Sequence, residues 1–258
     1  MNDLKADTRV IFFLILVQIG ATLLAWNLLS KDVEFVEGGA GYGTSFAFFV
    51  LIIFVTVILL AIIRLGLSRY LYLFTEYFGL FFILLFIAGS LTDSTGFGLL
   101  ASISVLLIKL KYGENRIVLL FVSLVICIGI SSIIGITFGP LPLILLLVLL
   151  SIYDFIAVKK TKHMISMAED VLKKKGPQLL SFSSPTDEII IGIADIIFPS
   201  ALFVSVYISE GMPVAIATSF ASIVGLMLLF KGPINEGMPA IPFVSLGIVG
   251  YIVGILLI

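Results

Sequence analysis

The sequence predicts an all-α membrane protein with nine transmembrane helices, a cytoplasmic N-terminus and an external C-terminus. The composition, the length of the apolar runs and the distribution of positive charge lead to this prediction. Of the 258 residues, 60% are apolar or aromatic and 12% are charged, and the mean hydropathy is +1.27. Soluble domains are about half apolar and about a quarter charged. The chain therefore has too few charges to cover a water-soluble surface.

Nine apolar runs are long enough to cross about 30 Å of hydrocarbon, which requires roughly 20 helical residues. The first run follows Asp3 and Asp7 without a cleavage site of small residues soon after it, so we expect a retained helix and not a signal peptide. The fourth is the weakest, because its purely apolar part extends only from Gly96 to Ile108, and a re-entrant segment is the alternative. The predicted spans are 10–29, 46–63, 70–90, 92–108, 117–137, 140–158, 188–208, 212–230 and 239–258.

The positive charges of the loops predict the orientation. With nine crossings, all but one of the 15 Lys and Arg residues, among them Lys109, fall on the N-terminal side of the membrane, and the exception is Lys31. Cytoplasmic loops carry the excess of positive charge. If the fourth run did not cross, the cations would be divided between the two sides. The charges therefore favour nine crossings with the N-terminus in the cytoplasm.

The chain is expected to form a single membrane domain, 1–258, with six helices in 1–158, a cytoplasmic loop at 159–187 and three helices in 188–258. Within the loop, apolar residues at helical spacing over 164–172 are followed by three lysines, which predicts an amphipathic helix on the inner leaflet; docking to a partner is the alternative. Ser184, Pro185 and Asp187 are expected to begin the seventh helix as cap, first-turn proline and first-turn acid.

Several classes of function are excluded by what the chain contains. A net charge of −1 provides no basic excess for nucleic acid, and Cys127, as the single cysteine, cannot form an intrachain disulfide. The single histidine, His163, cannot supply the metal pair of a zincin or a three-histidine zinc site. A rhomboid site requires a serine with a histidine inside the membrane, whereas His163 is expected in a cytoplasmic loop. The sequence therefore predicts neither a metal nor another cofactor.

Three carboxylates lie within predicted spans, where each costs at least about 2.5 to 3.5 kcal/mol and is by default a functional candidate. Asp154 lies five residues before Lys159, and Asp195 lies seven residues after Glu188. At 1.5 Å per residue, both are about 8 to 10 Å below the same membrane face. Antiparallel neighbouring helices would thus bring them to one level, although two separately solvated acids are the alternative.

Glu76 is a weaker candidate. It lies near Arg69 at the cytoplasmic end of the third span, where a snorkelling or helix-pairing role is expected before a catalytic one. Small residues at four-residue spacing predict close helix packing, and they are Ser131, Gly135 and Gly139 in one segment and Gly250 and Gly254 in another.

Three short motifs accompany the two aspartates. Tyr153-Asp154 ends the sixth span, Gly192-Ile193-Ala194-Asp195 lies in the seventh, and Pro239-Ala240-Ile241-Pro242 opens the ninth. Their order resembles the Y-D, G-x-G-D and P-A-L-P signatures of the presenilin and signal peptide peptidase family of intramembrane aspartyl proteases. The nine helices and the long loop between the aspartates also match, so the resemblance covers essentially the whole chain.

The resemblance implies that Asp154 and Asp195 are catalytic and that the other motif residues support the site or bind substrate. It also implies substrates that are transmembrane helical proteins in a lipid bilayer, and a multi-pass protein of the cell membrane. The predicted orientation is that of the presenilin branch, and the short loops favour a microbial, archaeal homologue without accessory subunits. The supporting residues are Tyr153, Gly192, Ala194, Pro239, Ala240, Ile241 and Pro242.

Two residues depart from the family pattern. Ala194 replaces the second glycine of G-x-G-D and adds a methyl group beside Asp195, with an altered substrate preference, a reduced activity or no effect as the possible consequences. Ile241 replaces the leucine of P-A-L-P, a change of branching that should leave the turn intact.

The residue types suit amide hydrolysis, which needs an activated water and an acid for the departing nitrogen. Two close carboxylates in a low-dielectric site cannot both ionise, so the pair retains one proton and supplies a base and an acid together. The sequence does not assign either role to a particular aspartate.

A helical substrate must also be unwound before cleavage, and its backbone then needs new hydrogen bonds. Pro239 and Pro242 lack N–H groups and predict an irregular start to the ninth span, where an extended peptide could add as a strand. The alternative is that these prolines simply begin a helix. Gly192 is expected to allow close backbone approach, with a packing role as the alternative.

The alternative function from another class is a transporter or channel that uses Asp154 and Asp195 as a proton or cation relay. No inverted repeat and no third well-placed acid support it. A third possibility is an inactive relative that binds helices without cleaving them, because Ala194 departs from the motif.

Overall fold

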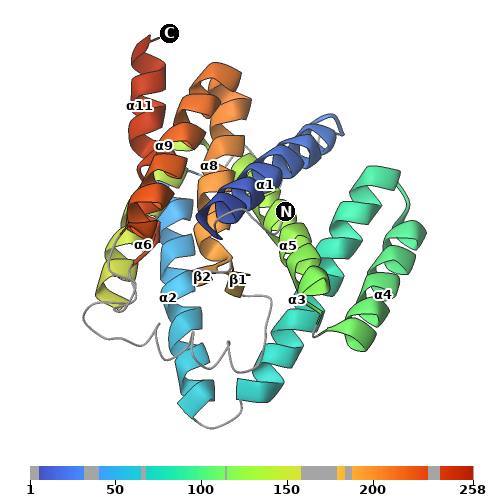
Figure 1. Cartoon of the computed structure of the whole chain (residues 1–258). Coiled ribbons are helices and arrows are strands. Elements are labelled where there is room, and N and C mark those ends of the chain that lie inside the picture. Colours follow the sequence, from blue (N-terminus) through green and yellow to red (C-terminus); the bar gives the residue numbers. More distant parts are fainter. Residues whose placement is uncertain are drawn as a thin grey trace.

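The computed structural model describes residues 6–31, 41–64, 68–113, 115–157, 179–183, 188–231 and 239–257. These residues are mostly helical, with one small sheet, as Figure 1 shows. The elements in chain order are α1 (Ala6–Leu29), α2 (Tyr42–Arg64), α3 (Ser68–Thr92), α4 (Thr95–Tyr112), α5 (Arg116–Thr137), α6 (Pro140–Phe155), β1 (Leu179–Ser183), β2 (Glu188–Gly192), α8 (Ala194–Glu210), α9 (Met212–Phe230), α10 (Ile241–Val244) and α11 (Gly247–Leu257).

Helix α8 is the centre of the bundle. Every residue from Ile196 to Val206 is buried, so the helix has no lipid-facing side over this stretch. It packs against α1, α5 and α9 most extensively and also contacts α6, α10 and α11. Figure 1 shows α8 between α9 and α1, with the small sheet at its N-terminal end. A helix that is apolar and buried all round forms the core of a bundle, and the other helices are arranged about it.

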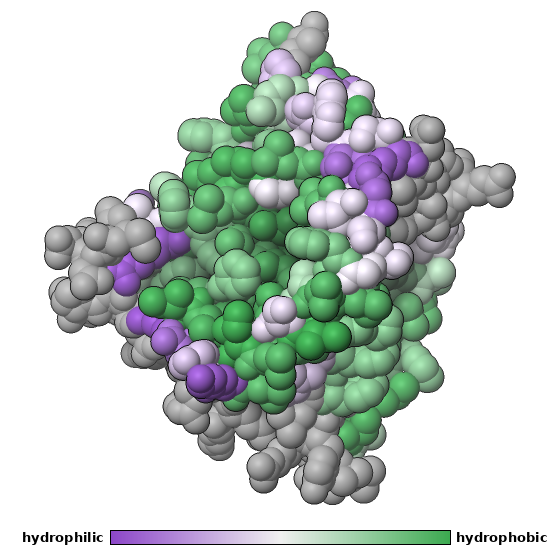
Figure 2. Space-filling view, turned by 90° about the vertical axis from the view of Figure 1, so that its right-hand side faces the viewer, coloured by the Kyte–Doolittle hydropathy of each residue, from purple (hydrophilic) through white to green (hydrophobic). Residues whose placement is uncertain are grey.

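Apolar helices overlap eight of the nine predicted spans, and α8, which overlaps the seventh, is not among them. Among the described residues, α1, α4, α5 and α9 are long and apolar enough to cross a membrane, judged by length and composition. Shorter apolar stretches occur at Tyr42–Ile58, Glu76–Thr92, Pro140–Phe155 and Ile241–Leu257. Figure 2 shows one face of the molecule, where apolar side chains cover a broad area and polar ones gather towards its margins. A mainly helical membrane protein is thus confirmed.

The seventh segment was expected to be helical from residue 188, and this prediction is wrong at its start. Residues Glu188–Gly192 form β2, which pairs antiparallel with β1 from Leu179↔Gly192 to Ser183↔Glu188, and α8 begins only at Ala194. Three consecutive isoleucines, 189–191, favour an extended strand when a partner strand is available. The cap predicted at 184–187 and the amphipathic helix predicted at 164–175 lie outside the described residues.

The ninth segment is also interrupted. The helix α10 ends at Val244, and α11 begins at Gly247, with Ser245 and Leu246 forming a turn between them. The turn keeps its hydrogen bonds, since the N–H of Leu246 donates to the carbonyl of Phe243 at 3.1 Å and that of Ile248 to Ser245 at 2.9 Å. The turn therefore interrupts the helix without leaving these N–H groups unpaired.

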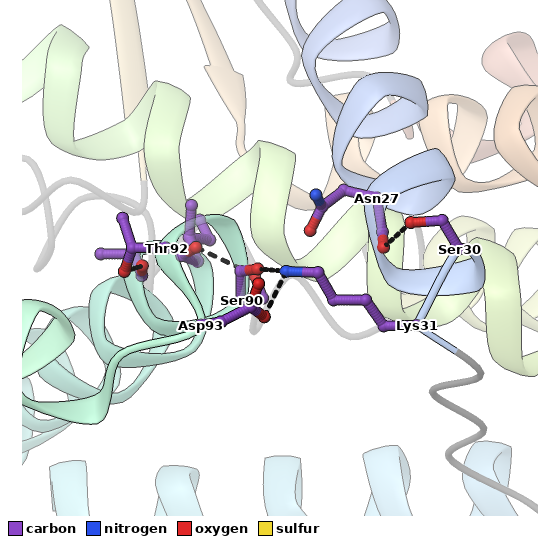
Figure 3. A network of polar contacts seen from close by, with 8 residues as sticks. Asn27, Ser30, Lys31, Ser90, Thr92 and Asp93 are labelled. Carbon is purple, nitrogen blue, oxygen red and sulfur yellow. Dashed lines mark hydrogen bonds and ion pairs between the residues drawn. The ribbon is translucent and has the colours of Figure 1, made fainter.

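Two ion pairs connect helices near the ends of α3. Figure 3 shows Lys31, just after α1, reaching Asp93 and the carbonyl of Ser90 at the turn between α3 and α4. The distance from Lys31 Nζ to Asp93 Oδ1 is 2.5 Å, and Asp93 has a positive φ of 54° in this turn. Ser94 then caps α4 by accepting from the N–H of Phe97. The C-terminal end of α1 therefore lies beside the α3–α4 turn.

The second ion pair joins Glu76 on α3 to Lys109 on α4, and Lys109 Nζ lies 5.0 Å from the centroid of the Tyr77 ring. The Lys109 side chain is only 2% exposed. Lys109 therefore lies in the last turn of α4, buried between two helices, and not in a solvated loop, while the side of the membrane assigned to it stays a prediction. Of the two roles expected for Glu76, helix pairing is the one observed, with Lys109 as the partner.

Glycines permit the closest helix contacts. A Cβ at Gly250 of α11 would lie 2.3 Å from the Ala217 carbonyl oxygen of α9, and one at Gly254 would lie 2.9 Å from Val214. A Cβ at Gly135 of α5 would lie 2.7 Å from Val204 of α8. These three positions have the predicted packing role. Gly139 does not, because a Cβ there would meet only Pro142 at 3.8 Å, close by in sequence.

We predict that Gly250→Ala separates α11 from α9 and lowers the thermal midpoint of the purified protein in detergent. The added methyl group meets a backbone carbonyl, which cannot move aside like the end of a flexible side chain. Gly79→Ala on α3 is the matched control, since a Cβ there meets nothing within 4 Å. The control should gain up to about 1 kcal/mol from helix propensity. Equal midpoints for the two variants would contradict the close packing.

Candidate active site

Asp154 lies in the last turn of α6 with only 3% of its surface exposed. Its carboxylate oxygen Oδ2 accepts a hydrogen bond from the backbone N–H of Ile241 at 3.1 Å. Ile241 is the first residue of α10, which packs against α6. The start of the ninth segment is therefore attached directly to this aspartate.

The two prolines of the C-terminal motif explain which N–H groups reach Asp154. Between Pro239 and Pro242, only Ala240 and Ile241 carry a backbone N–H. Of these two, the N–H of Ile241 hydrogen-bonds the Asp154 carboxyl. The prolines thus leave few main-chain donors at this point, and one of them is directed at the buried carboxylate.

The backbone groups of residues 239–242 were expected to be free to pair with an extended peptide, but the structure shows several of them in hydrogen bonds of their own. The carbonyl of Ala240 accepts from the N–H groups of Phe243 and Val244 at 3.0 and 3.1 Å, and that of Ile241 accepts from Ser245 at 2.9 Å. The reason is that α10 begins at this point and engages these carbonyls in its own turn. An added strand would therefore find the N–H of Ile241 and the carbonyls of residues 240 and 241 already engaged.

Asp195 lies in the first turn of α8 and is partly exposed. Its Oδ2 accepts from the backbone N–H of Gly192, the last residue of β2, at 3.2 Å. A Cβ at Gly192 would lie 3.1 Å from that same oxygen. The motif glycine therefore permits a tight turn in which the strand donates directly to the aspartate, which is the close backbone approach expected of it.

The two aspartates lie on neighbouring elements. Helix α6 packs against α8, and α10 contacts both of them. The carboxyls of Asp154 and Asp195 are close enough for their charges to interact. Among the residues that the structure describes, neither aspartate forms an ion pair with Lys, Arg or His. Backbone N–H groups, and not cations, are therefore the partners observed for each carboxyl.

The remaining motif residues surround these two turns. Tyr153 precedes Asp154 and is partly exposed, Pro239 is buried, and Pro242 is partly exposed. Ala194 is the first residue of α8 and is exposed, so its methyl group is not packed against a neighbour in the core. Over the described part of the chain, no cluster of three His, Cys, Asp or Glu side chains could hold a metal ion.

The sequence analysis missed two serines beside the site. Ser151 on α6 hydrogen-bonds Ser245, in the turn after α10, with 2.9 Å between the hydroxyl oxygens. Ser151 lies three residues before Asp154 and so occupies the same helix face. This spacing is the one signal in the sequence that could have drawn attention to it.

The small sheet is held against the bundle close to Asp195. Arg116, the first residue of α5, donates to the carbonyl of Ser181 in β1 at 2.8 Å. Phe182 of β1 meets Phe13 of α1 edge to face, with 5.8 Å between ring centroids. These contacts fix the sheet, and β2 leads from it directly into the Gly192–Asp195 turn.

A helical membrane protein with two neighbouring, backbone-bound aspartates has the architecture of an intramembrane aspartyl protease. The family described as "Signal-peptide peptidase, presenilin aspartyl protease" matches residues 11–258, and the chain belongs to this family. The chain is accordingly an aspartic endopeptidase that acts within the membrane. No curated protein matches it.

Two solved structures are similar over nearly the whole chain. Both are described as a presenilin family intramembrane aspartate protease, one in a P2 and one in a C222 crystal form. The P2 structure has a TM-score of 0.71 and 27% sequence identity, with 96% of each chain covered. The C222 structure has a TM-score of 0.68, 24% identity and the same coverage. The second comparison concerns the fold alone.

We predict that Ala194→Gly preserves or raises the rate of peptide cleavage. The methyl group is exposed at the start of α8, so its removal leaves no cavity, while the stability falls by at most about 1 kcal/mol from helix propensity. Gly192→Ala is the contrasting variant, because its new Cβ would press on Asp195 Oδ2 and lower the rate. Cleavage assays on folded protein in detergent test both. Complete loss of activity in Ala194→Gly would contradict this placement of the motif.

Proposed function

We propose that Asp154 and Asp195 form the catalytic pair and hydrolyse peptide bonds within transmembrane helical substrates. The observation that carries the proposal is that two carboxyls, on packed helices, are each bound by an N–H from a family motif. No cation neutralises either carboxyl among the described residues, so both remain free to exchange protons.

In the proposed reaction the pair shares one proton, because two close carboxylates in a low-dielectric site do not both ionise. The ionised carboxylate removes a proton from a water molecule, whose oxygen attacks the carbonyl carbon of the substrate. The protonated carboxyl donates to the carbonyl oxygen and so stabilises the tetrahedral intermediate. Proton transfer to the amide nitrogen then breaks the C–N bond and releases two chain ends.

The backbone donors give this chemistry its geometry. The N–H of Ile241 binds Oδ2 of Asp154, and the N–H of Gly192 binds Oδ2 of Asp195. Each carboxyl is thereby held by one oxygen, and its Oδ1 remains for the water or the substrate. Since the donors are main-chain groups at fixed turns, the carboxyls are oriented before the substrate binds, which lowers the reorganisation required in the reaction.

We further propose that an unwound substrate pairs with the sheet as an added strand. In the described part of the chain, each of β1 and β2 has one partner, so the sheet has outer edges that can accept another strand. The strand β2 ends at Gly192, three residues before Asp195, and Ile190 within it is 45% exposed. A peptide paired with β2 would be led towards Asp195 in an extended form. This location replaces the 239–242 segment considered from the sequence.

The proposed setting is the cell membrane, with nine crossings, a cytoplasmic N-terminus and an external C-terminus. The contact of Lys31 with Asp93 supports this topology, because the predicted external ends of the first and third spans lie together. In this topology the paired sheet and the two aspartates lie towards the cytoplasmic face.

We predict that Asp154→Asn and Asp195→Asn each reduce cleavage of a single-span helical peptide by at least about 100-fold. Asparagine keeps the shape of the side chain but cannot carry the shared proton, and acid–base groups typically contribute about 10²- to 10⁴-fold. The measurement is product formation by purified protein in detergent or lipid. Asp93→Asn, which changes an exposed carboxylate at the α3–α4 turn, is the matched control and should retain the wild-type rate.

A hydroxyl-containing peptide isostere should also inhibit the wild-type enzyme, because it resembles the tetrahedral intermediate. Retained cleavage by either active-site variant would remove that residue from the pair. Proton-coupled solute uptake by liposomes, without any cleavage, would support the transporter alternative.

A further inference from the structure

The segment that begins the ninth span is joined to α6 at two places. Ile241 donates its N–H to Asp154, and Ser245 meets Ser151 through a hydroxyl–hydroxyl hydrogen bond of 2.9 Å. On α6 the two attachment points are three residues apart, and on the C-terminal segment they are four residues apart. Each spacing is about one helical turn, so the two hydrogen bonds form successive links between the same pair of elements.

The direction of the serine hydrogen bond follows from its surroundings. The hydroxyl of Ser151 also contacts the carbonyl of Leu147 in its own helix at 2.7 Å. A carbonyl can only accept, so Ser151 uses its single proton there. Ser151 must then accept from Ser245. The donor order is therefore from Ser245 to Ser151 and from Ser151 to Leu147.

A second chain of hydrogen bonds connects Ser245 back to Asp154. The N–H of Ser245 donates to the carbonyl of Ile241 at 2.9 Å, and the N–H of Ile241 donates to Asp154. Together with the helix backbone between residues 151 and 154, these bonds close a ring across α6 and α10. Any displacement of Ser245 from Ser151 is transmitted to the N–H that holds Asp154.

We infer that Ser151 and Ser245 are positioning residues for the catalytic pair, because their hydroxyl link sets the register in which the Ile241 N–H meets Asp154. This inference rests on the proposed function of Asp154. Ser245 lies where the ninth segment breaks between α10 and α11, and its N–H still donates to the Ile241 carbonyl within the segment. The hydroxyl link adds a contact between elements to that local bond, because it ties the turn to α6.

The test compares Ser245→Ala and Ser151→Ala with Ser104→Ala. Ser104 on α4 is the matched control, since among the described residues its hydroxyl bonds only the Leu100 carbonyl of its own helix, at 2.7 Å. We expect kcat to fall by about tenfold in the two site variants, with KM nearly unchanged, which corresponds to one hydrogen bond. Ser245→Thr keeps the hydroxyl and should recover most of the rate. The double variant should be no worse than either single variant, since both remove the same link.

Hydrogen–deuterium exchange of the 239–246 segment provides a readout besides activity. In Ser245→Ala the exchange of this segment should accelerate while that of α9 stays unchanged. Wild-type kcat together with wild-type exchange in Ser245→Ala would overturn the inference, as would additive losses in the double variant. If the wild-type protein cleaves no helical peptide, the proposed function fails, and the exchange result still decides whether the serine link positions Ile241.

Discussion

A carboxylate inside a membrane-spanning bundle must be stabilised by the protein, because hydrocarbon offers no water to solvate it. The structure contains two solutions to that requirement. Glu76 is paired with Lys109, a cation only 2% exposed, and the pair fastens α3 to α4. Asp154 and Asp195 instead receive backbone N–H groups. A carboxylate beside a fixed cation is held in its ionised form, whereas one bound by neutral donors can gain and lose a proton. This difference separates a structural acid from a pair suited to catalysis.

Neutral backbone donors are available only where regular structure is interrupted, since helices and sheets engage their own N–H groups. The bundle has such an interruption beside each aspartate. The first residue of α10, Ile241, directs its N–H at Asp154, and the Gly192 turn frees an N–H for Asp195 between β2 and α8. Lipid excludes unpaired backbone from its interior. These interruptions are tolerated because the aspartate carboxyls accept hydrogen bonds from the N–H groups that lack a partner there. The irregular backbone and the two aspartates therefore stabilise each other.

The sequence predicted those features that depend on residue type and position alone. The length of the apolar runs located the helical segments. Burying a carboxylate in hydrocarbon is energetically unfavourable, and this alone identified Asp154 and Asp195 as functional candidates. The sheet was missed because Ile189 to Ile191 fit a buried strand and a membrane helix equally well. The choice between them depends on a partner, 179–183, that has no strand signal of its own. The pairing of Lys109 was not predicted, because counting charges loop by loop cannot detect that Glu76, 33 residues away, lies opposite it.

The position of Asp195 cannot be predicted from the neighbouring residues in the sequence alone. Pro199 lies one turn further along α8 and lacks an N–H, so the main-chain carbonyl of Asp195 has no donor at the usual fourth residue. The first turn of α8 is thus joined to the rest of the helix by fewer bonds than an ordinary turn. Contacts with other elements fix it in place, namely the Gly192 N–H on Asp195 and the Ser131 hydroxyl on the Ile197 carbonyl at 3.1 Å. The placement of Asp195 therefore depends on how β2 and α5 pack against α8. The four-residue motif determines the local turn, but the contacts with these two elements determine where that turn lies.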